Sequence, residues 1–154
     1  MLFRTHLAFG FLTGLLLIRY LEIKNQILFI AVLLFFSVFP DIDELKSRIS
    51  EKFKPLAVII HFIFKHRGFF HSIYVPVIFS AAFFALNLKY LGVAALFGYL
   101  SHLFLDSLTL GGIRLLYPLK KKLFSFIKTG SLVENMLFLA FSAADTYLLV
   151  TFPL

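Results

Sequence analysis

Two residues one helical turn apart offer the clearest chemistry in this sequence. His102 and Asp106 stand at positions i and i+4 within an apolar stretch. A helix would place the imidazole and the carboxylate on one face, with their Cβ atoms about 5 to 6 Å apart. Because such a pair can bind one metal ion, His102 and Asp106 form the first part of a candidate metal site.

Two more acids follow the proline that ends an earlier apolar stretch. Asp41 and Asp43 come directly after Pro40, at positions i and i+2. A proline at the end of an apolar stretch predicts a turn or a frayed helix end there. Both carboxylates can therefore act as oxygen ligands.

A short polar segment contributes two imidazoles and a cation. His66 and His71 lie on either side of Gly68, which lets the backbone turn. Arg67 is placed to hold an anionic group of a substrate. We expect this segment to form one edge of a substrate site.

Five apolar stretches must position these residues, and we expect each to be a helix. The chain is 60% hydrophobic with a mean hydropathy of +0.94, whereas soluble domains are roughly 45 to 50% apolar. We therefore predict an all-α fold, a polytopic membrane bundle of about five apolar helices that forms one domain over residues 1–154. A short interfacial helix is expected at residues 55–64. The five stretches cover residues 7–20, 27–39, 73–88, 90–105 and 132–154.

The positive residues predict the orientation of this bundle. With a cytoplasmic N-terminus, only Arg19, Lys24 and Lys89 of the 15 Lys and Arg face outward, as expected because short cytoplasmic loops retain positive charge. We predict a multi-pass protein of the inner (cytoplasmic) membrane with its N-terminus in the cytoplasm. The cytoplasmic residues are Arg4, Lys46, Arg48, Lys52, Lys54, Lys65, Arg67, Arg114, Lys120, Lys121, Lys122 and Lys128.

Alternating crossings would bring the polar helix ends to that same side. Ionisable residues in a membrane protein are costly and are usually functional. Their convergence follows from the order of the crossings alone and needs no motif. The residues that meet on the cytoplasmic side are His6, Asp41, Asp43, His66, His71, His102, Asp106 and Glu134.

The ligand chemistry is restricted to nitrogen and oxygen because the chain has no Cys. Imidazoles and carboxylates suit zinc first, with manganese or iron as alternatives, and one or two ions could share the site. Taken singly, a histidine at a membrane interface is more often a capped polar residue than a ligand. Asp43 or Glu134 could likewise cap a helix or pair with a lysine. His61 has no acidic neighbour and is left out, and we expect Asp145 to be a buried, hydrogen-bonded carboxyl.

Ordered blocks along nearly the whole chain are similar to a known family. They are Thr5-His6-Leu7, Phe39-Pro40-Asp41-Ile42-Asp43, the segments 66–72, 98–109 and 112–118, and Thr129-Gly130-Ser131-Leu132-Val133-Glu134. Together they resemble the YdjM family of inner-membrane proteins, described as metal-dependent hydrolases. The resemblance implies a helical membrane protein with hydrolase activity. The spacing of His102 and Asp106 is also similar to that in the all-helical zinc phospholipases C. Glu44 and Leu45 depart from the His and Pro expected after the acidic motif.

Our leading hypothesis is a membrane-bound metal-dependent hydrolase that acts on a phosphoester of an amphiphilic or anionic substrate at the cytoplasmic membrane face. Asp43, His66 and Glu134 are further ligands or general bases, and Arg67 and Arg114 bind substrate. The predicted metal ligands are His6, Asp41, His71, His102 and Asp106.

Two other classes of protein remain open. A noncatalytic membrane scaffold or regulator could use the same residues as a structural metal clamp with no open coordination position. A metal transporter would need acids through the depth of the bilayer, and only Asp145 fits that pattern. The Lys and Arg residues that give the chain its net charge of +7 lie mainly between the apolar stretches. This placement therefore predicts membrane lipid, in particular anionic lipid, as the partner rather than nucleic acid.

Overall fold

The computed structural model describes residues 1–43 and 69–152. Within these residues it contains five α-helices and no strand, so the five predicted helices are confirmed. The interfacial helix expected at residues 55–64 falls outside the described residues. Two short 3-10 helices, η1 (Phe39–Asp43) and η2 (Phe69–His71), precede and follow the gap. The α-helices are α1 (Phe3–Tyr20), α2 (Gln26–Val38), α5 (Tyr74–Ala85), α6 (Lys89–Ser107) and α7 (Leu132–Thr151).

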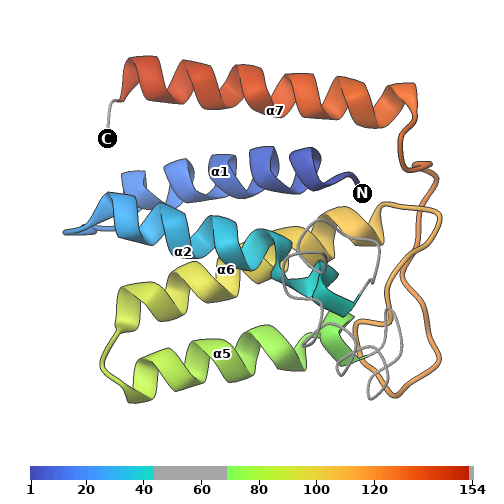
Figure 1. Ribbon diagram of the computed structural model, residues 1–154, viewed down its shortest axis with the longest axis horizontal. Helices are drawn as coiled ribbons and strands as arrows, with labels where there is room; N and C mark the ends of the chain where they lie inside the picture. The colour runs from blue at the N-terminus through green and yellow to red at the C-terminus, as the bar shows by residue number, and fades with distance from the viewer. Residues whose placement is uncertain (44–68, 153–154) are drawn as a thin grey trace.

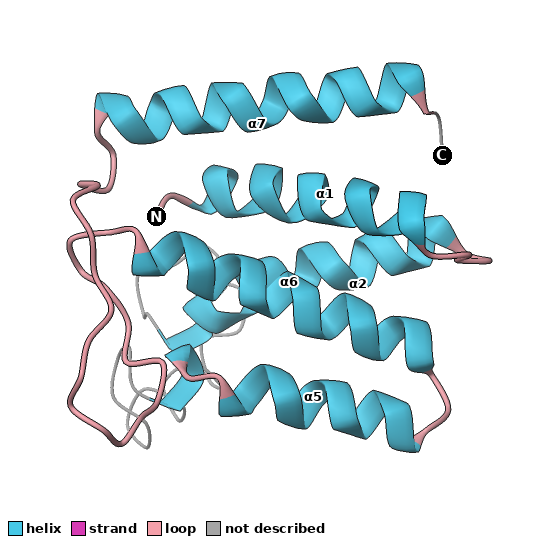
Figure 2. Ribbon diagram, turned by 180° about the vertical axis from the view of Figure 1, so that it is seen from behind, coloured by secondary structure: helices cyan, strands magenta, loops and turns pink. Residues whose placement is uncertain are grey.

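The helices lie side by side with their long axes roughly aligned (Figure 1). Helix α6 packs on α1, α2 and α5, and α1 also packs on α2 and α7. Seen from behind, α5 and α7 form the two outer edges of the bundle (Figure 2). The main apolar core lies where α2, α5 and α6 meet, around Phe36, Val75 and Tyr99.

Small residues let α2 approach its two neighbours closely. A Cβ at Gly98 of α6 would overlap the carbonyl oxygen of Leu33, and a Cβ at Gly10 of α1 would overlap the side chain of Ser37. Glycine at a helix interface permits the backbones to pack closely without strain, as in many membrane helices. As a result, the end of α2 lies directly between α1 and α6.

Length and composition distinguish α7 from the other described helices. Helix α7 has 20 residues, which corresponds to about 30 Å, the thickness of a bilayer core. Among the described helices it alone is both long and apolar enough to cross a membrane by length and composition. Helices α2 and α5 are shorter. The helical fold is therefore shown, whereas five membrane crossings are not.

Candidate metal centre

Four elements bring imidazoles and carboxylates to one end of the bundle. His6 lies in the first turn of α1, Asp41 in η1, and His71 at the end of η2. His102 and Asp106 lie in the last two turns of α6, one turn apart. All of them are at the end where the N-terminus lies, on the right of Figure 1. Residues from separate parts of the sequence therefore meet at one end of the bundle.

Asp106 is the centre of this cluster. Its Oδ2 lies 3.6 Å from Nε2 of His71 and 3.8 Å from Nε2 of His102. Nε2 of His102 is also 3.5 Å from Oδ1 of Asp41. One ligand atom from each of Asp41, His71, His102 and Asp106 lies within 4.8 Å of the other three. That spacing leaves room for one ion between two imidazoles and two carboxylates.

A backbone carbonyl orients the His102 ring. Nδ1 of His102 lies 2.9 Å from the carbonyl oxygen of Ser37. Because a carbonyl oxygen can only accept, Nδ1 must carry the proton and donate it, which leaves Nε2 with a free lone pair directed at the two acids. Metal-binding histidines are commonly held in this way through their second ring nitrogen. The close approach of α2 and α6 at Gly98 makes this contact possible.

The buried ring nitrogens provide the test of whether a metal fits. Nε2 of His102 and both ring nitrogens of His6 are fully buried, yet they make no hydrogen bond within the described part of the chain. Such groups are costly unless they bind something. A divalent ion beside the acids would satisfy Nε2 of His102, and a ligand next to Asp106 would satisfy Nε2 of His6. The donor set therefore fits a metal.

His6 lies beside the four-residue cluster. Its ring stacks on that of His102, with 3.9 Å between ring centroids, and its Nε2 lies 3.3 Å from Oδ1 of Asp106. The ammonium group of Met1 pairs with the same Oδ1. Asp106 therefore directs one oxygen to His6 and the other to His71 and His102.

Burial disfavours the charged form of Asp41. Burial raises the pKa of Asp41 above its ordinary value, because removal from water disfavours the charged carboxylate. Asp106 is almost completely buried. Two acids in so small a volume would repel each other when ionised, and a cation between them would remove that cost.

Glu134 is buried near this end of the bundle, but it belongs to a different set of contacts. Its Oε1 accepts hydrogen bonds from the Leu2 amide and the Thr5 hydroxyl, and its Oε2 accepts one from the Gly130 amide at 2.6 Å. Both oxygens are thus occupied by groups of the N-terminal turn and of the loop before α7. Glu134 ties these two segments together just before His6.

The remaining predicted site residues lie elsewhere or outside the described part. His66 and Arg67 fall in the gap between η1 and η2, and the side chain of Asp43 is also outside the described residues. Arg114 is exposed on the connection between α6 and α7. The structure therefore brings together Asp41, His71, His102 and Asp106, with His6 beside them.

Asp145 differs from its predicted state. It is buried on α7 as expected, but Oδ1 has no hydrogen-bond partner among the described residues. The carboxyl lies in an apolar groove that is also lined by Phe11, Leu34 and Phe138. The predicted burial of Asp145 is confirmed, whereas the predicted hydrogen bond is not found at Oδ1 among the described residues.

Sequence reasoning missed two polar partners of the predicted site residues. Ser37 provides the carbonyl that orients His102, and Thr5 provides a hydroxyl to Glu134. Ser37 did carry a signal, because it is the one polar residue after Gln26 in the apolar helix α2. Small polar residues at helix interfaces often mark close packing.

Comparison with known proteins points to one family. Residues 1–152 match the family described as YdjM inner membrane protein. The uncharacterized protein YvsG of Bacillus subtilis is 32% identical over 114 residues, which is 72% of this chain and 71% of that protein. The inner membrane protein YdjM of Escherichia coli is 35% identical over 85 residues, covering 51% of this chain but only 43% of that protein. No solved structure matches the chain.

Proposed function

The chain belongs to the YdjM family of inner membrane proteins, and on that premise we propose that it is a membrane-bound, metal-dependent hydrolase. Its substrate would be a phosphoester of an amphiphilic or anionic molecule at the cytoplasmic membrane face. One observation carries the proposal, namely the buried cluster of two imidazoles and two carboxylates whose ligand atoms lie within 4.8 Å of one another.

The donor set favours zinc. Two nitrogen and two oxygen ligands from Asp41, His71, His102 and Asp106 suit the four-coordinate geometry that zinc adopts in proteins. Manganese and iron accept the same donors. His6, which shares Asp106 with this set, is a fifth ligand or the ligand of a second ion.

The predicted site residues would have different roles in hydrolysis. A divalent ion, when bound, supplies Lewis acidity and activates water at neutral pH. Asp106 and His102 would hold it, and the Ser37 carbonyl keeps the His102 ring in the tautomer that can bind a metal. Asp43 and His66 are proposed as general bases, and Arg67 and Arg114 as binding groups for the substrate's anionic oxygens. We assign Glu134 to positioning the N-terminal turn rather than to proton transfer, because both of its carboxylate oxygens accept hydrogen bonds.

The membrane arrangement is part of the proposal. Helix α7 meets the requirements for a crossing, and the curated relatives in Escherichia coli and Shigella flexneri are named inner membrane proteins. We place all five helices across the bilayer with the N-terminus in the cytoplasm. The metal centre then lies at the cytoplasmic face, level with lipid headgroups.

A structural metal clamp is the second candidate function, and the burial of the centre favours it. His71, His102 and Asp106 are almost fully buried, and only the Asp41 side chain is partly exposed, at 14%. A centre with no open position would staple η1, η2 and α6 together without catalysis. The protein would then be a membrane scaffold or regulator.

Metal analysis of the purified protein, combined with lipid phosphoester assays, separates these functions. His102→Ala and Asp106→Ala should lose bound metal, whereas Glu22→Gln, an exposed acid just beyond the far end of α1, should retain it. Hydrolysis of any phospholipid or phosphodiester in a panel by the wild type, lost in the two variants, supports the hydrolase. Stoichiometric metal with no turnover on the whole panel supports the clamp. Absence of metal from the wild type contradicts both.

A further inference from the structure

The connection between α6 and α7 is a folded element and not a flexible linker. We refer to residues 108–131 as the 108–131 loop. Backbone hydrogen bonds of 2.8 Å run in both directions between Ile113 and Leu123, and the Ile73 amide donates to the carbonyl of Leu115. The side chains of Ile113 and Ile127 are buried. The loop therefore has a fixed inner face.

A glycine is required for this shape. Gly112 has a φ of +57°, and a Cβ there would overlap the carbonyl oxygen of Leu123. Left-handed backbone conformations are costly for residues other than glycine. The two branches of the loop can approach each other only because position 112 has no side chain.

The outer face of the loop combines large apolar side chains with cations. Phe126 is 79% exposed and Phe124 is 67% exposed. No acid occurs between Asp106 and Glu134. The other exposed apolar residues of the loop are Leu110, Leu116, Leu119 and Leu123, and its cations are Arg114, Lys120, Lys121, Lys122 and Lys128.

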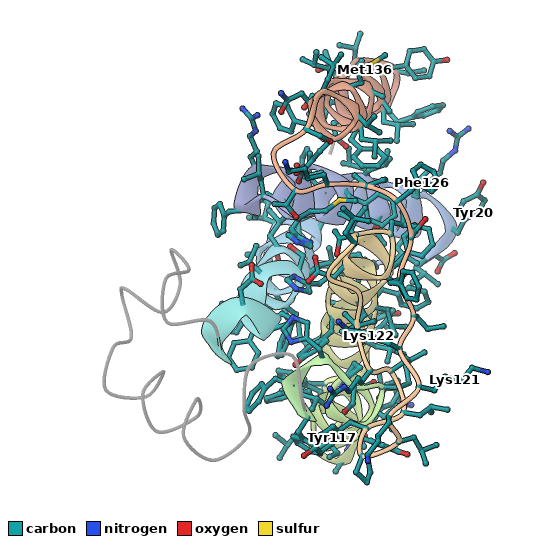
Figure 3. The ribbon with its side chains drawn as sticks, turned by 90° about the vertical axis from the view of Figure 1, so that its right-hand side faces the viewer. Tyr20, Tyr117, Lys121, Lys122, Phe126 and Met136 are labelled. Atoms are coloured by element: carbon teal, nitrogen blue, oxygen red, sulfur yellow. The ribbon has the colours of Figure 1, made fainter. Side chains whose placement is uncertain are left out.

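Figure 3 looks onto the end of the bundle that carries the metal centre. The 108–131 loop runs along one side of this end, and Lys121 extends away from the bundle (Figure 3). Phe126 lies on that same side of the molecule (Figure 3). The apolar and cationic side chains therefore face the surroundings of the bundle.

The position of α7 sets the depth of this loop. Helix α7 begins at Leu132, directly after the loop, and is just long enough to cross a bilayer core. If α7 crosses, its first residue lies at the interface, so the loop must lie in the headgroup layer. Water alone would leave Phe124 and Phe126 exposed at a cost. A single-stranded nucleic acid could also contact lysines and rings together, but a loop at the end of a membrane-crossing helix lies in the headgroup layer, where the interface accepts both kinds of side chain.

We propose that the 108–131 loop is an anionic-lipid binding surface, with Phe124 and Phe126 among the upper acyl chains and Lys120, Lys121 and Lys122 on lipid phosphates. The occupant is the anionic phospholipid of the leaflet next to the metal centre. The loop enriches such lipids beside that centre and fixes its depth. This inference rests on membrane insertion and not on hydrolysis.

The sequence offers a direct test because it contains no Trp. In Phe126→Trp, the new indole is a unique fluorophore, and brominated lipids that touch it quench its emission. The experiment compares vesicles containing brominated phosphatidylglycerol with vesicles containing brominated phosphatidylcholine, the rest of the lipid being unbrominated. Tyr20→Trp, at the last residue of α1 and therefore at the opposite end of that helix, is the matched control, and Phe124→Trp is a second probe of the loop.

We expect both brominated lipids to quench the indole of Phe126→Trp, with phosphatidylglycerol at least threefold more effective per lipid. One lysine near an anionic surface strengthens binding to that surface about fivefold. Three lysines should therefore easily produce a threefold preference for the anionic lipid. Adding Lys120→Gln, Lys121→Gln and Lys122→Gln to this variant should lower the preference clearly, with Arg114 and Lys128 left in the loop, while the indole stays quenched. The indole of Tyr20→Trp should show no preference.

Two results would overturn the inference. Quenching of both loop probes by aqueous iodide, and by neither lipid, would show that the loop faces water. Equal quenching by the two lipids, unchanged in the lysine variant, would remove the anionic specificity. Neither result bears on whether the centre hydrolyses a substrate, so the two proposals fail separately.

Discussion

Replacing Glu134 by glutamine tests whether this residue positions the metal centre or transfers protons. The carboxylate accepts hydrogen bonds from the Leu2 amide, the Thr5 hydroxyl and the Gly130 amide. Glutamine has the same shape but only one accepting oxygen, so its amide group must face a backbone N–H that also donates. At least one charge-assisted hydrogen bond is lost, and one partly buried backbone donor loses its acceptor.

The magnitude follows from these contacts. Losing such a bond at a partly buried donor lowers the free energy of unfolding by about 1 to 3 kcal/mol. The N-terminal turn that carries His6 loses its attachment to α7 at the same time. Disturbing a residue that orients metal ligands lowers metal affinity by about 10- to 100-fold. We therefore expect Glu134→Gln to lose both stability and metal affinity.

The assay is unfolding in mixed micelles together with metal titration by competition with a chelator. Ser131→Ala is the matched control, because the Ser131 hydroxyl accepts from the Glu134 amide and caps α7 without touching the carboxylate. It should cost about 1 kcal/mol and leave metal affinity unchanged. If Glu134→Gln abolishes turnover while stability and metal affinity stay at wild-type values, Glu134 is a general base and the positioning assignment is refuted.

Three further predictions concern packing, metal and the loop. Gly98→Ala places a Cβ on the Leu33 carbonyl oxygen, so it should lower the free energy of unfolding by about 1 to 3 kcal/mol and weaken metal binding. Gly92→Ala meets mainly the movable Phe84 ring and should lower both by less. Equal losses in the two variants would contradict the role of the α2–α6 contact. Chelation should lower the unfolding temperature of the wild type, because a metal at 100 times its Kd adds about 2.7 kcal/mol to the free energy of unfolding. The unfolding temperature of Asp106→Ala should not change on chelation. A similar shift in both proteins would place the metal elsewhere. Gly112→Ala, introduced into Phe126→Trp, should expose the indole to aqueous iodide without changing metal content, and a protected indole would show that the loop tolerates a side chain at the position where φ is +57°.

The helices could be predicted because their signal is local. Five apolar stretches separated by charged segments correspond to α1, α2, α5, α6 and α7, with ends shifted by a few residues. The spacing of His102 and Asp106 likewise follows from one helical turn. Their meeting with Asp41 and His71 could be expected from alternating helix directions, because that argument needs only the order of the elements.

The finer contacts could not be predicted because they join distant parts of the chain. Leu2 and Glu134 are 132 residues apart, and no pattern near either residue indicates the other. The carbonyl of Ser37 meets His102 only because Gly10 and Gly98 let three helices approach. Asp145 could be expected to be buried, but its lack of a hydrogen bond among the described residues depends on which helices border its groove. Long-range packing decides these features.

X-ray absorption at the metal edge of the purified protein tests the central claim most directly. The account predicts one tightly bound divalent ion with imidazole nitrogen and carboxylate oxygen neighbours at about 2.0 to 2.2 Å. The imidazole signal should decrease in His71→Ala and stay unchanged in the control His61→Ala. A protein that binds no metal in stoichiometric amount, or a metal shell without histidine, would contradict the account.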